Sequence, residues 1–513
     1  MKQYLIACAL CIACTSCNLD IEPENGLTYT NSFNTETELN ATTSSIQFFI
    51  NSAVPENQVF ITAGVKADEL KEGEQVRQWN PKSVIDVQDW KGLYDLVFEC
   101  NLLLDNIHRT AGLSQERRNF HVGQAEFGLG LAYLVLVQRY GDVPIPIDSK
   151  TIAAYGTSPQ MQVINTAIEH AQKAFDILPI YGQLKDINGN IIVNKQYASK
   201  GACAALLAHL YAWKGSVIDL YKLKGDAQEA YRKSVEYASM IISKQVGPYQ
   251  LCANPEELCT YLSDPSRVNP EAIFTIVYDI NRSTYAVTPN RIASQFVSWP
   301  VKETSLLGDI VSETGFRIYK STAKGMYSSD DLRLKAFFYK IDSLHVVDNH
   351  DYALLYKFRK SVYDADQYAP SGKSFRSLNA DYVYWRLADI YLLRAECNAK
   401  LGNKSQAIAD LNIIRSRAQA PLFGASTETD DLAKVIFRER EKEFIGETDT
   451  RYFDIIRNNY ISTELQGKFR MLTRQDIING ALVLPVPQSA MKEKDGKVIN
   501  TVIRQKAYWL PFM

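Results

Sequence analysis

The segment from Tyr384 to Ala420 reads YWRLADIYLLRAECNAKLGNKSQAIADLNIIRSRAQA, with one short turn between two helical periodicities. In its first half, apolar residues recur at the spacing that places them on one face of a helix: Leu387, Ala388, Tyr391, Leu392 and Ala395. In its second half, a second apolar face is formed by Ala407, Ile408, Leu411 and Ile414. Gly402 lies between them and can adopt the left-handed conformation that ends a helix. The segment predicts a tight helical hairpin, of the kind that stacks in repeats of about 34 residues.

Other amphipathic segments extend this pattern along the chain. They predict helices over Asp89–Arg109, Gln115–Arg139, Pro159–Leu178, Gln196–Lys214, Asp226–Lys244, Ala380–Leu401, Lys404–Arg417 and Asp430–Glu447. We expect an all-α dominated fold, a TPR-like helical-repeat superhelix of about four helix pairs, with a loop-rich insertion and a few short strands. The expected divisions are a signal peptide over 1–17, an N-terminal tether and loop region over 18–88, helical pairs over 89–247, a variable loop-rich ligand-binding region over 248–379, and C-terminal helical pairs with a closing tail over 380–513.

The first seventeen residues indicate export. Lys2 precedes an apolar run, Tyr4–Ala13, which is too short to span a bilayer but fits the core of a signal peptide. The run ends at Cys14-Thr15-Ser16-Cys17, which resembles a lipobox. We therefore expect Cys17 to become the acylated first residue of the mature chain and to hold it on a membrane. An ordinary secretory signal that happens to have Cys17 nearby is the alternative.

Composition excludes some classes of function. The chain has 56 basic and 58 acidic residues, so its charge gives no field that attracts nucleic acid. After the signal, no apolar run in the sequence approaches the roughly 20 residues of a transmembrane helix. We expect an anchored protein that does not span the membrane and does not bind nucleic acid.

The opening segment resembles the most recognisable part of the SusD/RagB family of outer-membrane nutrient-binding lipoproteins. Other stretches resemble that family in the same order: Trp90, Leu93, Tyr94, Asn101, Leu104 and Ile107; the turn Tyr140–Pro144; Asn269–Phe274; Arg440, Glu443, Phe444, Glu447, Arg451, Asp454 and Arg457; Leu484–Pro487; and Asn500, Gln505 and Tyr508. The resemblance thus runs from about Trp90 to Tyr508.

The chain departs from the family pattern before the Tyr140–Pro144 turn. It reads GQAEFGLGLA from Gly123 where the family usually has GEARFLRA, so Gln124, Glu126 and Gly130 are atypical. His170 and Ala171 stand where an Asp-Leu pair is common. We expect these changes to weaken local ion pairs while leaving the fold intact.

The resemblance implies a cell-surface lipoprotein of the outer membrane, facing the cell exterior. Such a protein binds oligosaccharides or polysaccharide fragments and hands them to a SusC-like TonB-dependent transporter. It is a binding protein with no cofactor, not an enzyme. Three alternatives remain: the same architecture with peptide ligands, a surface glycan hydrolase, and a helical scaffold that binds no ligand.

A sugar ring presents a CH face and a rim of hydroxyls, so its site needs aromatic side chains beside polar groups. The resemblance implies that loops build such sites in the first hundred or so residues and in the central insertion. The ligand-binding candidates are Asp68, Arg77, Trp79, Asn80, Tyr285 and Trp299, and further loop tyrosines are Tyr278, Tyr319 and Tyr327. Local packing is the alternative for each tryptophan. We assign Trp90, Trp213 and Trp385 to the core and Trp509 to the closing tail.

Catalytic and metal signatures are weak. The mature sequence has no GxSxG, HExxH or CxxC motif, and we expect no catalytic residue. Asp186, Asn188 and Asn190 imitate the start of a calcium loop, but Tyr197 stands where the closing Glu is needed.

Asn188-Gly189 instead favours a type I′ hairpin turn, and we expect no metal there. Cys252 and Cys259 are close enough in sequence to form a disulfide. The alternative is that both remain buried thiols. The Arg and Glu residues of the family motifs are expected to form a buried charge network that fixes helix register.

Overall fold

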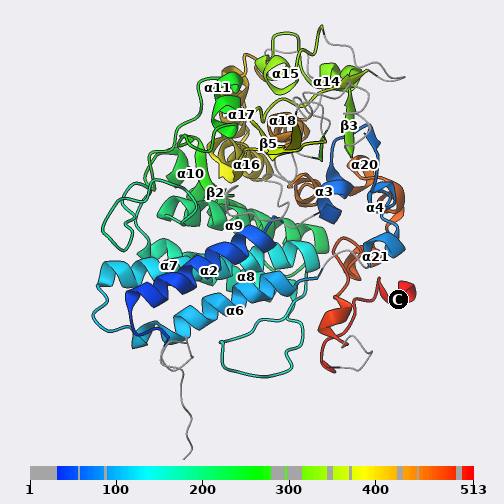
Figure 1. Ribbon diagram of the computed structural model, residues 1–513. Helices are drawn as coiled ribbons and strands as arrows, with labels where there is room; N and C mark the ends of the chain where they lie inside the picture. The colour runs from blue at the N-terminus through cyan, green and yellow to red at the C-terminus, as the bar shows by residue number, and fades with distance from the viewer. Residues whose placement is uncertain are drawn as a thin grey trace, which may run out of the picture.

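Helices that stack side by side form much of the molecule (Figure 1). The computed structural model describes residues 32–55, 58–85, 89–278, 295–296, 315–343, 351–368, 372–424, 431–447, 450–492 and 499–513. The main stack consists of α6 (Lys91–Asn106), α7 (Gln115–Tyr140), α8 (Gln160–Ile177), α9 (Lys200–Tyr221), α10 (Ala227–Ile242), α16 (Leu387–Lys400), α17 (Lys404–Arg417) and α18 (Leu432–Phe444). Each of these helices contacts the next in the series, which confirms the predicted helical-repeat fold.

The hairpin predicted from the opening segment is formed by α16 and α17. Gly402 between them has a φ of +79°, the left-handed conformation that ends a helix. The first helix begins at Leu387 instead of Ala380, because Tyr382–Arg386 forms strand β7, which pairs antiparallel with β2 (Ala272–Ile276). The sequence YVYWR is rich in aromatic and β-branched residues, which favour a strand. Trp385 is buried as predicted, but on that strand.

The N-terminal region is more ordered than the expected tether and loops. It contains α2 (Glu36–Ala53) and α3 (Gln58–Gly64). Thr35 and Glu38 form a capping box at the start of α2, each side chain accepting a hydrogen bond from the other residue's backbone N–H. Leu39, Ile46 and Ile50 are fully buried where α2 packs on α6 and α7. The prediction of a loop region over 18–88 is therefore wrong for these two helices.

Helix α7 lies at the centre of the stack and carries the departures from the family pattern. The expectation that no segment after the signal approaches a membrane-spanning length is wrong for this helix, which is long and apolar enough to cross a membrane, but 94% of its most apolar window is buried in the protein. The Glu126 carboxylate lies 2.5 Å from Nδ1 of His170, so two atypical residues contact each other. Gln124 exchanges two hydrogen bonds with the backbone of Ala198. The departures thus retain polar contacts of their own, and the expected weakening of local ion pairs relative to the family pattern stays a prediction.

Smaller elements surround the stack. The N-terminal part adds β1 (Glu69–Leu70), α4 (Glu74–Arg77), α5 (Pro81–Val84) and η1 (Ile107–Arg109). The variable region contains α11 (Pro255–Leu262), β3 (Phe316–Tyr319), α14 (Lys320–Met326), α15 (Leu332–Phe337), β4 (Tyr352–Ala353), β5 (Ser361–Ala365) and β6 (Lys373–Leu378). The C-terminal part has α19 (Arg451–Arg457), α20 (Ile461–Glu464), η2 (Gly467–Met471), α21 (Arg474–Ile478), η3 (Gln488–Ala490) and η4 (Leu510–Phe512). Strands β1, β3 and β4 form one antiparallel sheet, and β5 and β6 form a hairpin.

Two local alternatives left open by the sequence are decided by the structure. Asp186 accepts hydrogen bonds from the backbone of Asn188 and Asn190, so its carboxylate closes a hairpin turn; Gly189 has a φ of +81° but Asn188 has no positive φ, so the predicted type I′ geometry is wrong. Cys252 and Cys259 are both buried free thiols, so the disulfide is not formed.

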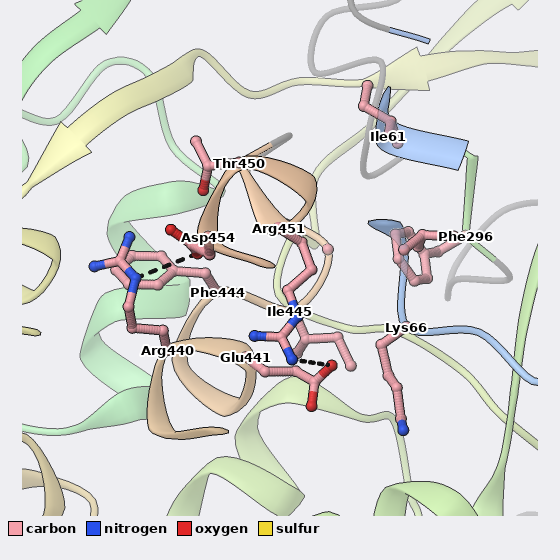
Figure 2. Close-up of a pocket in the computed structure, with 12 residues that line it drawn as sticks. Ile61, Lys66, Phe296, Arg440, Glu441, Phe444, Ile445, Thr450, Arg451 and Asp454 are labelled. Atoms are coloured by element: carbon pink, nitrogen blue, oxygen red, sulfur yellow. Dashed lines mark ion pairs between the residues drawn. The ribbon is translucent and has the colours of Figure 1, made fainter. Parts of the chain in front are cut away.

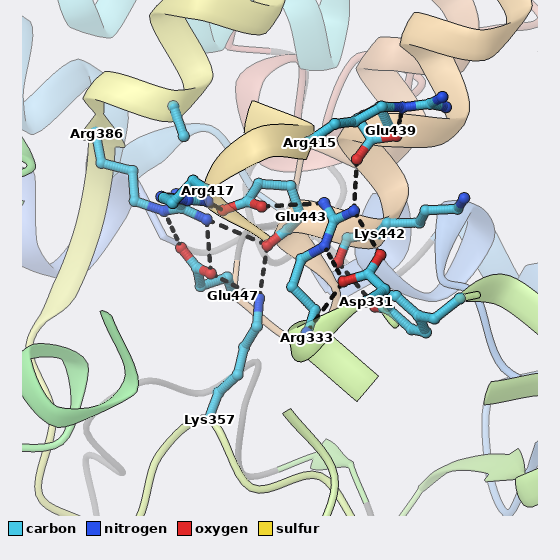
Figure 3. A network of polar contacts seen from close by, with 12 residues as sticks. Asp331, Arg333, Lys357, Arg386, Arg415, Arg417, Glu439, Lys442, Glu443 and Glu447 are labelled. Carbon is cyan, nitrogen blue, oxygen red and sulfur yellow. Dashed lines mark hydrogen bonds and ion pairs between the residues drawn. The ribbon is translucent and has the colours of Figure 1, made fainter. Parts of the chain in front are cut away.

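A buried cluster of charged side chains joins the C-terminal helices to the variable region (Figure 3). Arg386 contacts the carboxylates of Glu271 at 2.6 Å, Glu443 at 2.8 Å and Glu447 at 2.6 Å. Arg417 contacts Glu271 at 3.0 Å and also pairs with Glu443. These five side chains come from β7, α17, α18 and the segments beside β2 and α18, so the predicted charge network is confirmed.

The cluster continues into the variable region. Lys357 contacts Glu447 at 2.7 Å, and Arg333 of α15 contacts Glu443 at 3.2 Å. Burial alone raises the pKa of Glu443, but the charges of Arg417, Arg386 and Arg333 outweigh burial and hold that pKa well below its usual value. Replacing one member leaves its partners charged, buried and unpaired, which costs about 3–5 kcal/mol in such clusters.

Acid should therefore unfold this protein through its buried carboxylates. In the same way, burial raises the pKa of Glu396 but Arg457 lowers it more, to about 2. A depressed pKa contributes stability above the unfolded value of about 4.3, and that stability is lost as pH falls toward the folded value. The melting temperature should fall steeply between about pH 4.5 and pH 2.

The matched variants are Glu443→Gln in the cluster and Glu236→Gln, whose exposed carboxylate pairs with Lys233 on α10. Glu443→Gln should lower the free energy of unfolding at neutral pH by about 3–5 kcal/mol, and Glu236→Gln by less than about 1 kcal/mol. Equal effects in urea denaturation would contradict a stabilising role for the cluster.

Candidate functional site

One hollow among the described residues lies where the N-terminal helices meet α18 and α19 (Figure 2). It encloses about 490 Å³ of space that opens to solvent. Its apolar lining is formed by Ile61, Val65, Phe296, Phe444 and Ile445. Its polar lining is formed by Lys66, Arg440, Glu441, Thr450, Arg451 and Asp454.

Close backbone packing sets the wall of this hollow. A Cβ on Gly64, the last residue of α3, would lie 2.5 Å from the backbone nitrogen of Tyr452 in α19. Only glycine allows the two helices to approach this closely. Phe60 reinforces the contact, with its ring centroid 4.6 Å from that of Tyr452. The end of α3 therefore places Val65 and Lys66 at the edge of the hollow.

Some charged side chains of the hollow are held in ion pairs, and one is not. Arg451 contacts Glu441 at 3.0 Å, and its guanidinium lies 3.8 Å from the Phe437 ring centroid. Arg440 contacts Asp454 at 3.2 Å. Figure 2 shows both ion pairs on the same side of the hollow. Lys66 forms no ion pair with any residue in the described part of the chain, so its ammonium group remains available to a ligand.

The β1–β3–β4 sheet continues from Lys66. Glu69 accepts hydrogen bonds from the hydroxyls of Tyr319 at 2.5 Å and Tyr352 at 2.7 Å. The bond to Glu69 raises the pKa of Tyr319 to about 12, so this phenol stays protonated at neutral pH. The half-buried ring of Tyr319 is a candidate stacking surface on this sheet.

The other predicted polar residues mainly support the local fold. Asp68 accepts hydrogen bonds from the backbone of Tyr319 at 2.6 Å and the hydroxyl of Thr322 at 2.8 Å. Arg77 is buried and donates to the carbonyl of Ala67 at 2.9 Å. The Asn80 side chain caps α5 by accepting from the backbone of Lys82. The structure brings Asp68 close to β3 but does not gather these residues into one cavity.

Trp79 was expected to contact a ligand, but the structure places it in the core. Its side chain is fully buried, and its indole N–H donates to the carbonyl of Ala481 at 2.8 Å. Its ring centroid lies 4.5 Å from that of Phe469 and 6.0 Å from that of Trp509. No face of the ring is open to a ligand, so Trp79 instead ties the N-terminal region to the closing tail.

Tyr285 and Trp299 lie outside the described residues. Trp299 is three positions beyond Phe296, which lines the hollow. Sequence reasoning missed Lys66 because it follows a helix where loops were expected. Arg451, a motif residue assigned to the structural charge network, also lines the hollow, and Glu441, which pairs with it there, was not singled out as a site residue.

Comparison with known proteins places this geometry in a family. A family model described as "SusD family" matches residues 345–509, and one described as "Starch-binding associating with outer membrane" matches residues 19–212. The chain belongs to the SusD/RagB family. Two SusD-like proteins of Formosa agariphila are each 22% identical to it, over 78% of this chain and 75% or 77% of their own length.

Solved structures of SusD relatives share the fold. A SusD homolog from Bacteroides thetaiotaomicron superposes with a TM-score of 0.72 at 22% identity, covering 93% of this chain and 98% of its own. NanU of Bacteroides fragilis gives a TM-score of 0.68 at 18% identity, with 95% and 99% coverage. Surface glycan-binding protein A from B. thetaiotaomicron gives 0.66 at 17% identity, with 94% and 100% coverage.

The burial of Trp79 leads to a prediction that separates folding from binding. Trp79→Ala should lower the free energy of unfolding by about 3–5 kcal/mol, because it removes a large buried ring and a buried hydrogen bond. Phe48→Ala, on a ring that is 63% exposed, is the control and should change it little. Urea denaturation measures both, and a Trp79→Ala variant as stable as the parent would contradict the assignment of Trp79 to the core.

Proposed function

We propose that this protein is a cell-surface lipoprotein that binds oligosaccharides and hands them to a SusC-like TonB-dependent transporter of the outer membrane. The match of residues 19–212 to a family model described as starch-binding and associating with the outer membrane carries this proposal. SusD-family membership supports a surface carbohydrate-binding role. The transporter and the direction of transfer are expectations drawn from the family.

The chemistry of the hollow supports a carbohydrate ligand. The apolar side chains that line it are largely buried, Phe296 at 3% and Phe444 at 8% exposure, so they offer the CH face of a sugar ring a narrow contact, and the exposed Lys66 can donate to hydroxyl oxygens. We propose that Tyr285 and Trp299, from the central insertion, supply stacking surfaces beside Phe296, and that Tyr319 extends the site along β3. Affinity at one site should be modest, because hydroxyl-rich ligands regain hydrogen bonds to water when they dissociate.

The carboxylates that line the hollow support a protein that binds its ligand without cleaving it. Glu441 and Asp454 are its two lining carboxylates, and each is held by an arginine. A glycan hydrolase needs one carboxyl group that gives a proton and a second that assists. Neither carboxylate is placed to transfer a proton to a ligand while it is paired in this way.

Calorimetric titration of the chain from Asn18 with a panel of oligosaccharides and peptides tests the substrate class. We expect an oligosaccharide to bind and Lys66→Ala to weaken binding about tenfold, because a charged donor to the ligand is lost. Lys335→Ala, on an exposed lysine of α15, is the matched control and should leave affinity unchanged.

Each other outcome of the titration has a distinct meaning. Binding of peptides alone would replace the ligand class but keep the architecture. Oligosaccharide binding that is unaffected by Lys66→Ala would move the site away from the hollow. Product formation on prolonged incubation would contradict the assignment as a binding protein.

The lipid anchor is tested separately. Cys17→Ala removes the residue that we propose is acylated, so the variant should appear in the soluble fraction while the parent stays with the outer membrane. Equal retention of both proteins in the membrane fraction would contradict anchoring through Cys17.

A further inference from the structure

Residues 141–159, which connect α7 to α8, form a loop that is held by internal hydrogen bonds and extends beneath α6 (Figure 1). Its base is closed by two backbone hydrogen bonds between Val143 and Ser158, of 3.3 and 2.9 Å. Asp148 shapes its tip by accepting hydrogen bonds from the backbone N–H groups of Lys150 and Thr151. These contacts give the loop one defined conformation.

Two contacts hold the outgoing limb of the loop along α6. The Tyr94 hydroxyl donates to the carbonyl of Pro144 at 2.8 Å, near the start of the helix. The backbone N–H and the hydroxyl of Ser149 both donate to Asp105 in its last turn, at 2.8 and 2.7 Å. Eleven residues of helix and five residues of extended chain both span roughly 16 Å. The tip is therefore fixed at the C-terminal end of α6.

The tip presents aliphatic side chains to solvent. Ile147 is 74% exposed and Ile152 is 103% exposed, and Ala153 and Ala154 beside them are exposed as well. Asp148 and Lys150 are the charged side chains of the tip, and the backbone hydrogen bonds that Asp148 accepts from Thr151 and Lys150 lower the pKa of its carboxyl group, so the tip has one charge of each sign. The residues that usually anchor a protein interface are Trp, Tyr and Arg, and the stretch 147–154 contains none of them.

The N-terminal segment enters the fold at the same end of α6. The carbonyl of Phe33 accepts a hydrogen bond from Thr110 at 2.8 Å, and Thr110 is five residues beyond Asp105. The guanidinium of Arg109 lies 5.8 Å from the Phe33 ring centroid. Fifteen residues separate Cys17 from Ser32, so this end of the domain stays within about 50 Å of the proposed lipid anchor.

We propose that the loop tip, Ile147–Ala154, inserts into the interfacial layer of the membrane that holds the Cys17 anchor. This inference rests on the anchoring part of the proposed function. Aliphatic side chains beside one acidic and one basic group suit the boundary layer between acyl chains and headgroups. With the anchor, the tip gives a second contact, which fixes the orientation of the domain on the membrane.

Site-specific fluorescence on the lipidated full chain tests this inference. Ile152→Cys is labelled with an environment-sensitive nitrobenzoxadiazole dye, while the native thiols at Cys100, Cys203, Cys252, Cys259 and Cys397 are buried. Ile413→Cys on α17, at the opposite edge of Figure 1, is the matched control. Both are reconstituted in vesicles of phosphatidylethanolamine and phosphatidylglycerol that contain a lipid with a spin label near its headgroup. We expect quenching of the label at position 152 to exceed that at 413 by at least about threefold.

The other outcomes overturn the inference, and they separate its failure from failure of the anchor. Equal, weak quenching at both positions, with the protein still floating with the vesicles, would remove the membrane contact but keep the anchor. Shielding of position 152 from aqueous iodide only in transporter-containing outer membranes would assign the tip to a protein partner. A lipidated chain that does not float with vesicles would remove the anchor and the inference together.

Discussion

The rest of the structure depends on the ion cluster around Glu443. A buried charge without a partner costs several kcal/mol, so the elements that supply the charges must keep their relative positions. Arg386 ends strand β7, Arg417 ends α17, and Glu271 immediately precedes β2. One carboxylate of α18 thus links the strand pair to the last helices of the superhelix. Arg333 and Lys357 extend the same constraint into the variable region.

The cluster also prepares the candidate site. Residues two positions apart on a helix point in different directions. Glu443 therefore faces the buried cluster while Glu441 faces the hollow with Arg451. The charges that fix α18 on one side hold its other side in place as a wall of the hollow. These contacts fix the position of the wall, and the central insertion that follows Phe296 in sequence is the proposed source of the aromatic contacts.

The features that could be predicted from the sequence are those that depend on local periodicity. The α16–α17 hairpin, the run of helices and the structural role of the charged motif residues follow from spacing and from the cost of unpaired charge. The same reasoning missed α2, because Thr and Ser occupy much of its middle and lower its helix propensity, although its capping box is visible in the sequence. It also misplaced Trp79, since a tryptophan among polar neighbours in a loop gives no sign that a distant tail covers it.

The candidate site was harder to predict because its residues come from separate parts of the chain. Lys66 follows α3, Glu441 lies on α18, and Phe296 belongs to the insertion. No spacing in the sequence connects them, and only the packing of α3 on α19 brings them together. The expected site was described as aromatic and hydrogen-bonding groups, which stays a prediction, while most of the described positions named for it stabilise the fold.

A crystal structure with a bound oligosaccharide tests the central claim most directly, that a rigid superhelix presents a glycan site at the α3–α18–α19 hollow. The account predicts sugar density over Phe296 and within hydrogen-bonding distance of Lys66, with the Glu443 cluster unchanged. Density confined to the surface of α8, with none at the residues that line the hollow, or a rearranged Glu443 cluster, would contradict it.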